Sequence, residues 1–172
     1  MMQRKHLVLV GLPGSGKSTV GRLVAETLGT ALTDLDRIVA GASGRSVAEL
    51  FAEQGEPAFR RIERAAMDGA IAAPPHVIAP GGGWIAEPGN LEAAGHAWLL
   101  YLAVAPETAA ERLAGDLSRP LLAGPDRGES LRDLLRQRER WYRRAQDEID
   151  AAGPPEAVAR LVIARARAKA GW

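Results

Sequence analysis

A glycine-rich segment near the start of the chain carries the clearest chemical signal. It reads Gly-Leu-Pro-Gly-Ser-Gly-Lys-Ser over residues 11–18, between an apolar run and a helical pattern. This spacing lets successive backbone N–H groups point at phosphate oxygens, while the lysine reaches the terminal phosphates and the last serine offers an oxygen to Mg²⁺. The segment predicts a phosphate-binding loop rather than a simple turn. The residues expected to bind the nucleotide are Gly14, Ser15, Gly16, Lys17, Ser18 and Thr19.

Two carboxylates follow the second strand that the sequence predicts. Asp34 and Asp36 come after the apolar run 31–33, and side chains two residues apart on a strand lie on the same side. Open α/β sheets bind ligands at the carboxyl ends of their strands. One carboxylate would therefore hold Mg²⁺ together with Ser18, and the other would orient an attacking hydroxyl group and accept its proton. The alternative for Asp36 is the N-cap of a following helix.

Three consecutive glycines follow the third predicted strand. Gly81, Gly82 and Gly83 have no side chains, so a ligand could approach the backbone closely and accept hydrogen bonds from its N–H groups. The alternative is a turn that needs positive φ angles. We interpret the triplet as part of a ligand site.

Most basic residues of the chain are arginines, whose planar fork binds a carboxylate or a phosphate through two parallel hydrogen bonds. Arg60 follows Phe59, Arg119 lies in the segment 114–128, and Arg138 lies on a late helix. Arginines that converge next to a phosphate loop indicate a substrate that bears a carboxylate. For any single arginine, a solvated helix face is the alternative.

Short apolar runs that alternate with amphipathic stretches must position these residues. The alternation predicts an α/β fold with a parallel sheet and helices on both faces. The segment 114–128 contains three glycines and two prolines, which predicts a mobile loop. A lid, a binding loop and disorder are the common explanations for a loop of this length. The predicted strands cover residues 6–10, 31–33, 76–79, 97–102 and 149–150.

Several residues mark expected helix starts. Ser46 with Glu49 predicts a capping box, and Ser130 with Asp133 predicts a weaker cap. Prolines also suit the first turn of a helix, because the backbone N–H group that they lack has no helical partner there. The prolines expected in this position are Pro57, Pro106 and Pro155.

Bulk composition limits the remaining possibilities. A chain of 172 residues, of which 47% are hydrophobic, fits one domain over 1–172. The net charge of +1 gives no reason to expect nucleic acid or a membrane as partner, so a small molecule is expected. The absence of cysteine and of a signal peptide fits a cytoplasmic protein, and the absence of a heptad pattern fits a monomer.

The histidines and the large apolar side chains are not expected to take part in chemistry. His6, His76 and His96 lack the spacing of metal ligands and are interpreted as structural or exposed. The residues interpreted as core packing are Phe51, Met67, Trp98 and Tyr101.

Together these segments resemble the shikimate kinase family over nearly the whole chain and in the order typical of that family. The matching segments are the phosphate loop, 34–36, 55–56, 59–63, 81–83, 119–122, and Arg138 four residues before Tyr142. The resemblance implies a fold like that of the nucleoside monophosphate kinases, with a five-stranded parallel sheet in the order 2-3-1-4-5. It also implies a lid over 114–128, acid-binding helices over 36–64, and transfer of the γ-phosphoryl group of ATP to the 3-hydroxyl group of shikimate.

The resemblance also implies roles for single residues. Asp36 would act as base, Asp34 and Ser18 would hold Mg²⁺, and Glu63 would brace nearby arginines. The residues with catalytic roles would be Asp36, Lys17 and Arg119. Those that contact shikimate would be Asp36, Phe59, Arg60, Gly81, Gly82, Gly83 and Arg138. Beyond the phosphate loop, those that contact ATP would be Arg112, Arg119 and Pro155.

Two other functions are compatible with a phosphate loop. A gluconate-type kinase shares the fold, but its usual Asp-Gly-Asp followed by histidine is absent here. A non-catalytic module that binds nucleotide or shikimate for regulation is the other alternative. The presence of Lys17, Asp34, Asp36 and Arg119 argues against it.

Overall fold

A parallel sheet of five strands forms the centre of the computed structural model, which describes residues 3–115 and 126–172. The strands lie in the order β2-β3-β1-β4-β5, and each neighbouring pair is parallel. This arrangement confirms the predicted α/β fold and strand order. The strands are β1 (Leu7–Val10), β2 (Leu32–Asp34), β3 (Val77–Ala79), β4 (Trp98–Ala103) and β5 (Asp147–Asp150).

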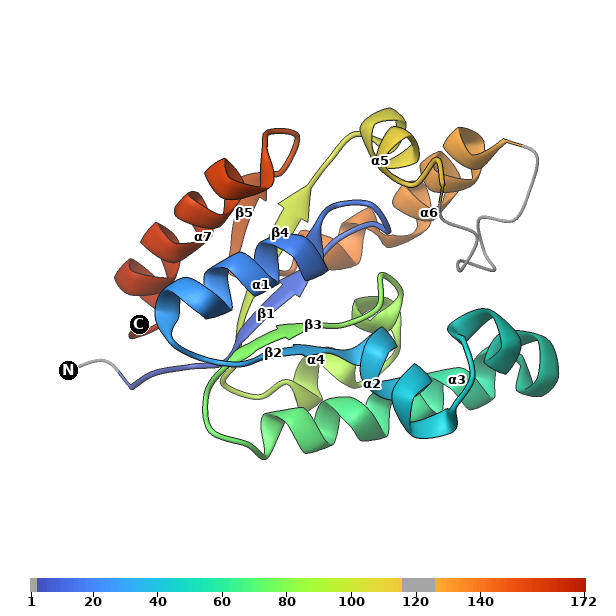
Figure 1. Cartoon of the computed structure of the whole chain (residues 1–172), viewed down its shortest axis with the longest axis horizontal. Helices are drawn as coiled ribbons and strands as arrows, with labels where there is room; N and C mark the ends of the chain where they lie inside the picture. The colour runs from blue at the N-terminus through green and yellow to red at the C-terminus, as the bar shows by residue number, and fades with distance from the viewer. Residues whose placement is uncertain (1–2, 116–125) are drawn as a thin grey trace.

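Helices cover both faces of the sheet (Figure 1). Helices α1 and α7 pack on one face, whereas α3, α4 and α6 pack on the other. Within the two described ranges, no helix combines the length and the hydrophobicity needed to cross a membrane. The helices are α1 (Lys17–Leu28), α2 (Leu35–Ser43), α3 (Val47–Ile71), α4 (Asn90–Ala93), α5 (Pro106–Arg112), α6 (Arg127–Tyr142) and α7 (Pro155–Lys169), with a short 3₁₀ helix η1 (Trp84–Ala86).

Strand β1 contributes side chains to two hydrophobic cores. Leu7 and Leu9 face α1 and α7, while Val8 and Val10 face the opposite layer. A central strand of a parallel sheet is buried on both faces, which explains why this run is apolar without alternation. Of the residues expected in the core, the buried ones are Met67, Trp98 and Tyr101, and Phe51 is half-buried.

The helix starts agree with the sequence in part. The capping box of Ser46 and Glu49 is present, and Pro106 and Pro155 lie in the first turns of α5 and α7. The cap predicted at Ser130 is wrong. Helix α6 begins earlier, and its N-cap is Asp126, whose carboxylate accepts a hydrogen bond of 2.8 Å from the Glu129 N–H group.

The expected first-turn position of Pro57 is confirmed, because the helical backbone of α3 is interrupted just before this proline. Pro57 lies inside α3, two residues after Gly55, whose backbone is not helical (φ 76°, ψ 166°). Gly55 therefore divides α3 by a kink, and the helical backbone starts again close to the proline. A residue with a side chain rarely adopts this φ angle, so the kink depends on glycine.

A pair of histidines lies at the amino ends of β1 and β3. The rings of His6 and His76 meet edge to face with centroids 5.0 Å apart. His6 Nε2 donates to the carbonyl oxygen of Ile71 (3.2 Å), and its Nδ1 accepts from the His76 N–H group (3.4 Å). Both His6 nitrogens are thus satisfied in the neutral form of the ring. The pair is structural, as expected, and His96 is exposed.

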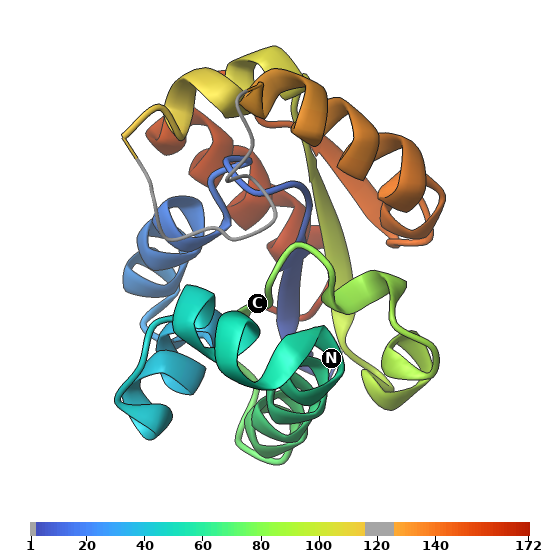
Figure 2. The ribbon, with the colours of Figure 1, turned by 90° about the vertical axis from the view of Figure 1, so that its right-hand side faces the viewer.

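The loops that carry the candidate site lie at the opposite end of the sheet. Figure 2 looks toward the carboxyl ends of the strands and shows the loop after β1 and the loop after β3 on this side. The junction of β2 with α2 adds Asp34 and Asp36 to the same edge. The sheet topology therefore brings together three segments that are separated in the sequence.

Candidate active site

The phosphate loop connects β1 to α1. The N-cap of α1 is Gly16, and no side chain caps this end, so the first N–H groups of the helix are available to an anion. The ammonium group of Lys17 lies over the loop and donates to the carbonyl oxygens of Gly11 (2.9 Å) and Leu12 (2.8 Å). The loop thus presents a positive charge and a helix N-terminus to the same space.

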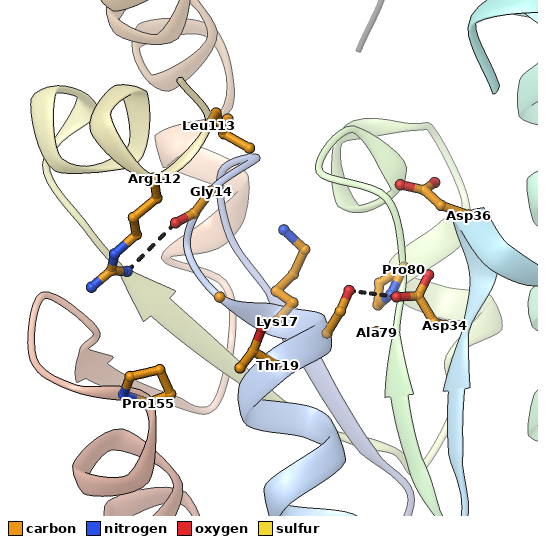
Figure 3. A pocket seen from close by; sticks show the side chains of 12 residues that line it. Gly14, Lys17, Thr19, Asp34, Asp36, Ala79, Pro80, Arg112, Leu113 and Pro155 are labelled. Atoms are coloured by element: carbon orange, nitrogen blue, oxygen red, sulfur yellow. Dashed lines mark hydrogen bonds between the residues drawn. The ribbon is translucent and has the colours of Figure 1, made fainter. Parts of the chain in front are cut away.

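A cavity of about 360 Å³ opens above the phosphate loop (Figure 3). Most of the residues predicted to bind nucleotide or metal line it together. Among those that the structure describes, Ser15 is the exception, because its side chain is completely buried within the loop. The lining residues are Gly14, Gly16, Lys17, Ser18, Thr19, Asp34, Asp36, Ala79, Pro80, Arg112, Leu113 and Pro155.

Ser18 and Asp34 meet at one side of this cavity. The Ser18 hydroxyl group donates a short hydrogen bond to the Asp34 carboxylate, as the dashed line in Figure 3 shows. Magnesium prefers oxygen ligands and is usually bound by one or two carboxylates together with water and substrate phosphates. The described residues contain no cluster of three or more acidic, histidine or cysteine ligands. The two oxygens of Ser18 and Asp34 therefore fit a Mg²⁺ ion that takes its other ligands from water and the phosphates.

Asp34 and Asp36 have different structural roles. Asp34 is the N-cap of α2 and accepts from the Arg37 N–H group at 3.2 Å. Asp36 lies in the first turn of α2, and its side chain lines the cavity. The N-cap alternative is therefore wrong for Asp36, because the helix begins one residue after Asp34.

The glycine triplet separates the phosphate loop from α3. A Cβ atom on Gly82 would lie 2.9 Å from Pro13 Cδ of the phosphate loop. A Cβ atom on Gly81 would overlap the Glu63 carboxylate, and one on Gly83 would overlap the Arg60 guanidinium group. Only residues without side chains let both partners come this close. Close packing within the protein thus explains why these three positions lack side chains. The expected contacts with a ligand stay a prediction.

Glu63 is a buried carboxylate at the centre of the site. It is 1% exposed, accepts from Arg60 Nη1 at 2.7 Å, and accepts from the Gly81 N–H group at 3.1 Å. Burial raises the pKa of Glu63, the Arg60 charge opposes this, and Asp36 adds a further increase through its negative charge. For Arg60, burial lowers the pKa, but Glu63 and Glu56 outweigh it and raise the value.

Arg138 approaches the triplet from α6. Its side chain is buried, and Tyr142, one turn later, donates a hydrogen bond of 2.5 Å to the Gly82 carbonyl oxygen. Burial raises the pKa of Tyr142 to about 12, while the charges of Arg138 and Arg60 act to lower it. The charges of both arginines thus lower the pKa of the same hydroxyl group. Their joint contact with a carboxylate stays a prediction.

Phe59 packs next to Arg60. It is buried in a small cluster with Val39 and Leu50, between α2 and α3. The Arg60 guanidinium carbon lies 5.4 Å from the centroid of its ring. The ring of Phe59 thus provides an apolar surface against which the Arg60 guanidinium group packs.

Arg112 and Pro155 lie on the same wall of the cavity (Figure 3). Arg112 Nη2 donates to the carbonyl oxygens of Ala151 (2.9 Å), Ala152 (2.8 Å) and Gly153 (3.3 Å). These bonds tie the end of α5 to the loop between β5 and α7. The sequence did not predict these three hydrogen bonds, because backbone acceptors leave no trace in residue types.

The expected lid is only partly described. Arg119 lies outside the described residues, as does the segment 116–125. The last two residues of the expected lid, 127–128, lie in the first turn of α6. Leu113, Ala79 and Pro80 were not expected in the site, although each lies next to a predicted site residue or strand.

Comparisons with known proteins agree with this geometry. The family model described as shikimate kinase matches residues 13–167. A shikimate kinase from Mycobacterium avium is 44% identical over 161 residues, which cover 92% of this chain and 91% of the relative. The structure of a shikimate kinase from Acinetobacter baumannii in complex with shikimate superposes with a TM-score of 0.92 at 30% identity, over 96% of this chain and 94% of the other.

A gluconokinase from Sinorhizobium meliloti gives a TM-score of 0.64 at 19% identity, over 98% of this chain and 94% of the other. This likeness shows a common fold only. The family model, by contrast, covers most of the chain, and the mycobacterial relative matches it nearly end to end. The chain therefore belongs to the shikimate kinase family.

Proposed function

We propose that this chain transfers the γ-phosphoryl group of ATP to the 3-hydroxyl group of shikimate and forms shikimate 3-phosphate and ADP. The supporting observation is the position of the glycine triplet, in contact distance of Pro13 on one side and of Arg60 and Glu63 on the other. A phosphoryl donor on the phosphate loop and an acid held by Arg60 would therefore face each other across the triplet. Phosphoryl transfer depends mainly on such positioning and on charge neutralisation.

Asp36 is the base in this proposal. It lines the nucleotide cavity and lies near enough to Glu63 to raise that residue's pKa. Its carboxylate would orient the acceptor hydroxyl group and take its proton as the oxygen attacks the γ-phosphorus. Lys17 would exchange its bonds to Gly11 and Leu12 for bonds to phosphate oxygens.

Ser18 and Asp34 would hold Mg²⁺, which when bound neutralises charge on the phosphates. The backbone of Gly14, Ser15 and Gly16 would donate to the phosphates, with Thr19 behind them. Arg112 and Pro155 would flank the adenine base, a role that fits their shared wall. Arg119 would add a positive charge near the transferred group.

The acid would bind between two helices. Arg60 and Arg138 would contact its carboxylate, and Phe59 would support Arg60 from below. The backbone of Gly81, Gly82 and Gly83 would contact the acceptor, although the Gly81 N–H group itself donates to Glu63. Glu63 would keep the Arg60 fork in place through the 2.7 Å ion pair.

We also propose a monomeric enzyme with one kinase domain over 1–172, in the cytoplasm, that acts on a small molecule without nucleic acid or membrane partners. The absence of cysteine suits a reducing compartment. A lid over 114–128 and acid-binding helices over 36–64 belong to the same proposal. Sedimentation of the purified chain tests the monomer.

One assay tests the reaction. ADP release is followed with ATP and Mg²⁺ while shikimate, quinate, gluconate and nucleoside monophosphates are offered in turn. We expect turnover with shikimate and formation of its 3-phosphate. Turnover with gluconate alone would support the gluconate-type alternative, and binding of shikimate without turnover would support the regulatory alternative.

A further inference from the structure

Three carboxylates lie close to the single positive charge of Arg60. Glu63 binds its Nη1 at 2.7 Å, and Glu56 binds its Nη2 at 2.8 Å. A third carboxylate, that of Glu87, lies 3.5 Å from its Nε. Glu63 is 1% exposed, whereas the Glu56 and Glu87 side chains are 45% and 39% exposed. The acid-binding arginine therefore lies in a locally negative environment before any substrate arrives.

Glu87 reaches Arg60 from a different part of the fold than the other two carboxylates. Glu56 and Glu63 lie on α3 with Arg60, while Glu87 is the C-cap of η1, just after the glycine triplet. Glu87, Glu56 and Arg60 line a second cavity of about 440 Å³. This cavity shares no lining residue with the nucleotide cavity.

The contact of Glu87 differs from the others in kind. Glu63 and Glu56 accept hydrogen bonds from Arg60 and hold its orientation. At 3.5 Å from Nε, Glu87 forms an ion pair without hydrogen-bond geometry. Its negative charge thus acts on Arg60, while the orientation of the fork depends on Glu63 and Glu56. Removal of the Glu87 charge should leave Arg60 in place.

We propose that Glu87 determines acid specificity by competing with the acceptor carboxylate for Arg60. An incoming carboxylate is attracted by Arg60 and Arg138 and repelled by the fixed negative charges beside Arg60. Glu87 is the one of the three whose charge can be removed without loss of a hydrogen bond to the arginine. The negative charge of Glu87 weakens the binding of acids and has no such effect on the binding of neutral analogues. This inference rests on the proposed function, in which Arg60 binds the carboxylate of shikimate.

The test compares Glu87→Gln with the unchanged chain. The KM for shikimate should fall about two- to fivefold, the range that partly exposed ion pairs support, while kcat and the KM for ATP stay the same. The inhibition constant of methyl shikimate, a neutral ester, should not change. Because salt screens exposed charges, the difference in KM for shikimate between Glu87→Gln and the unchanged chain should become smaller at about 0.5 M NaCl.

Glu92→Gln is the matched control. Glu92 lies on α4, is exposed, and pairs with Arg144 at 3.6 Å, so its substitution removes the same charge away from Arg60. This control should leave the KM for shikimate unchanged. Glu87→Ala should act in the same direction as Glu87→Gln, because both remove the carboxylate.

Three results would overturn the proposal: an unchanged KM in Glu87→Gln, a raised KM, or an equal change for the acid and the ester. A raised KM would mean that Glu87 aligns Arg60. Calorimetric titration with shikimate alone gives the same comparison without turnover. If the unchanged chain binds shikimate but does not phosphorylate it, the proposed reaction fails while the Glu87 comparison still stands.

Discussion

The hydroxyl group of Tyr142 donates a hydrogen bond of 2.5 Å to the carbonyl oxygen of Gly82. Both groups are buried, and the bond joins the last residue of α6 to the loop after β3. Because Arg138 lies one turn before Tyr142, this bond also fixes the distance between Arg138 and the glycine triplet.

Tyr142→Phe should therefore lower both stability and affinity for the acid. The substitution leaves the Gly82 carbonyl oxygen buried without its donor, which costs about 1–3 kcal/mol in free energy of unfolding. Urea denaturation measures this loss, and we expect a higher KM for shikimate. Tyr101→Phe is the control, because the Tyr101 hydroxyl group makes no hydrogen bond to the described residues. Equal losses in the two variants would contradict the prediction.

Asp36→Asn should abolish most of the turnover and preserve nucleotide binding. The amide has the same shape but cannot accept the proton, and general bases typically contribute about 10²–10⁴-fold to rate. Steady-state kinetics should show a fall of that order in kcat with a nearly constant KM for ATP. An unchanged kcat would exclude Asp36 from the chemistry.

Arg138→Lys should raise the KM for shikimate about tenfold, because lysine lacks the planar fork and charged hydrogen bonds contribute about 1.5–3 kcal/mol. The KM for ATP should change much less. Arg136→Lys, on the exposed side of α6 where Arg136 pairs with Asp133, is the control. Equal shifts for both substrates in Arg138→Lys would argue against carboxylate binding by this arginine.

Gly81→Ala should disrupt the acid site. The added Cβ atom would overlap the carboxylate of Glu63, which is too buried to move aside. We expect a loss of stability of about 1–3 kcal/mol and a large loss of activity. Gly69→Ala is the matched control, since nothing lies within 4 Å of its added Cβ atom on α3. That variant should be more stable by about 0.5–1 kcal/mol, because alanine favours helix.

Stability should fall as the pH drops below neutrality. Burial, and then the nearby His76, lower the pKa of His6 below its usual 6.5. The folded state therefore binds this proton less tightly than the unfolded state, so stability is fully present above 6.5 and is lost as the pH falls toward the folded pKa. Urea denaturation across this range should show the loss, and His6→Gln should reduce its slope. His96 is exposed, so His96→Gln should leave the slope of stability against pH unchanged. An equal change of slope in both variants would refute the assignment to His6.

Much of the fold could be predicted because its signals are local. The apolar runs predicted four strands to within one residue at each end and the fifth to within two, and the Gly-Lys-Ser sequence located the phosphate loop. The capping box at Ser46 was equally local. Ser130 was misread because Asp126 offers the same type of cap four residues earlier, and the sequence does not show which one starts the helix.

The acid site could be predicted only in part. The roles of Arg60 and Arg138 were predicted from the family resemblance, but the bond from Tyr142 to Gly82, which joins α6 to the glycine triplet, depends on tertiary packing. Glu87 carries no signal in the sequence, since 27 positions separate it from Arg60. Such contacts arise from tertiary structure and not from periodicity or motif.

The histidine pair and the candidate active site lie at opposite ends of the sheet. The histidine pair lies where β1 and β3 begin, and the phosphate loop and glycine triplet lie where these strands end. Substitutions around the imidazole rings should therefore change how stability depends on pH without altering the phosphate loop or the glycine triplet.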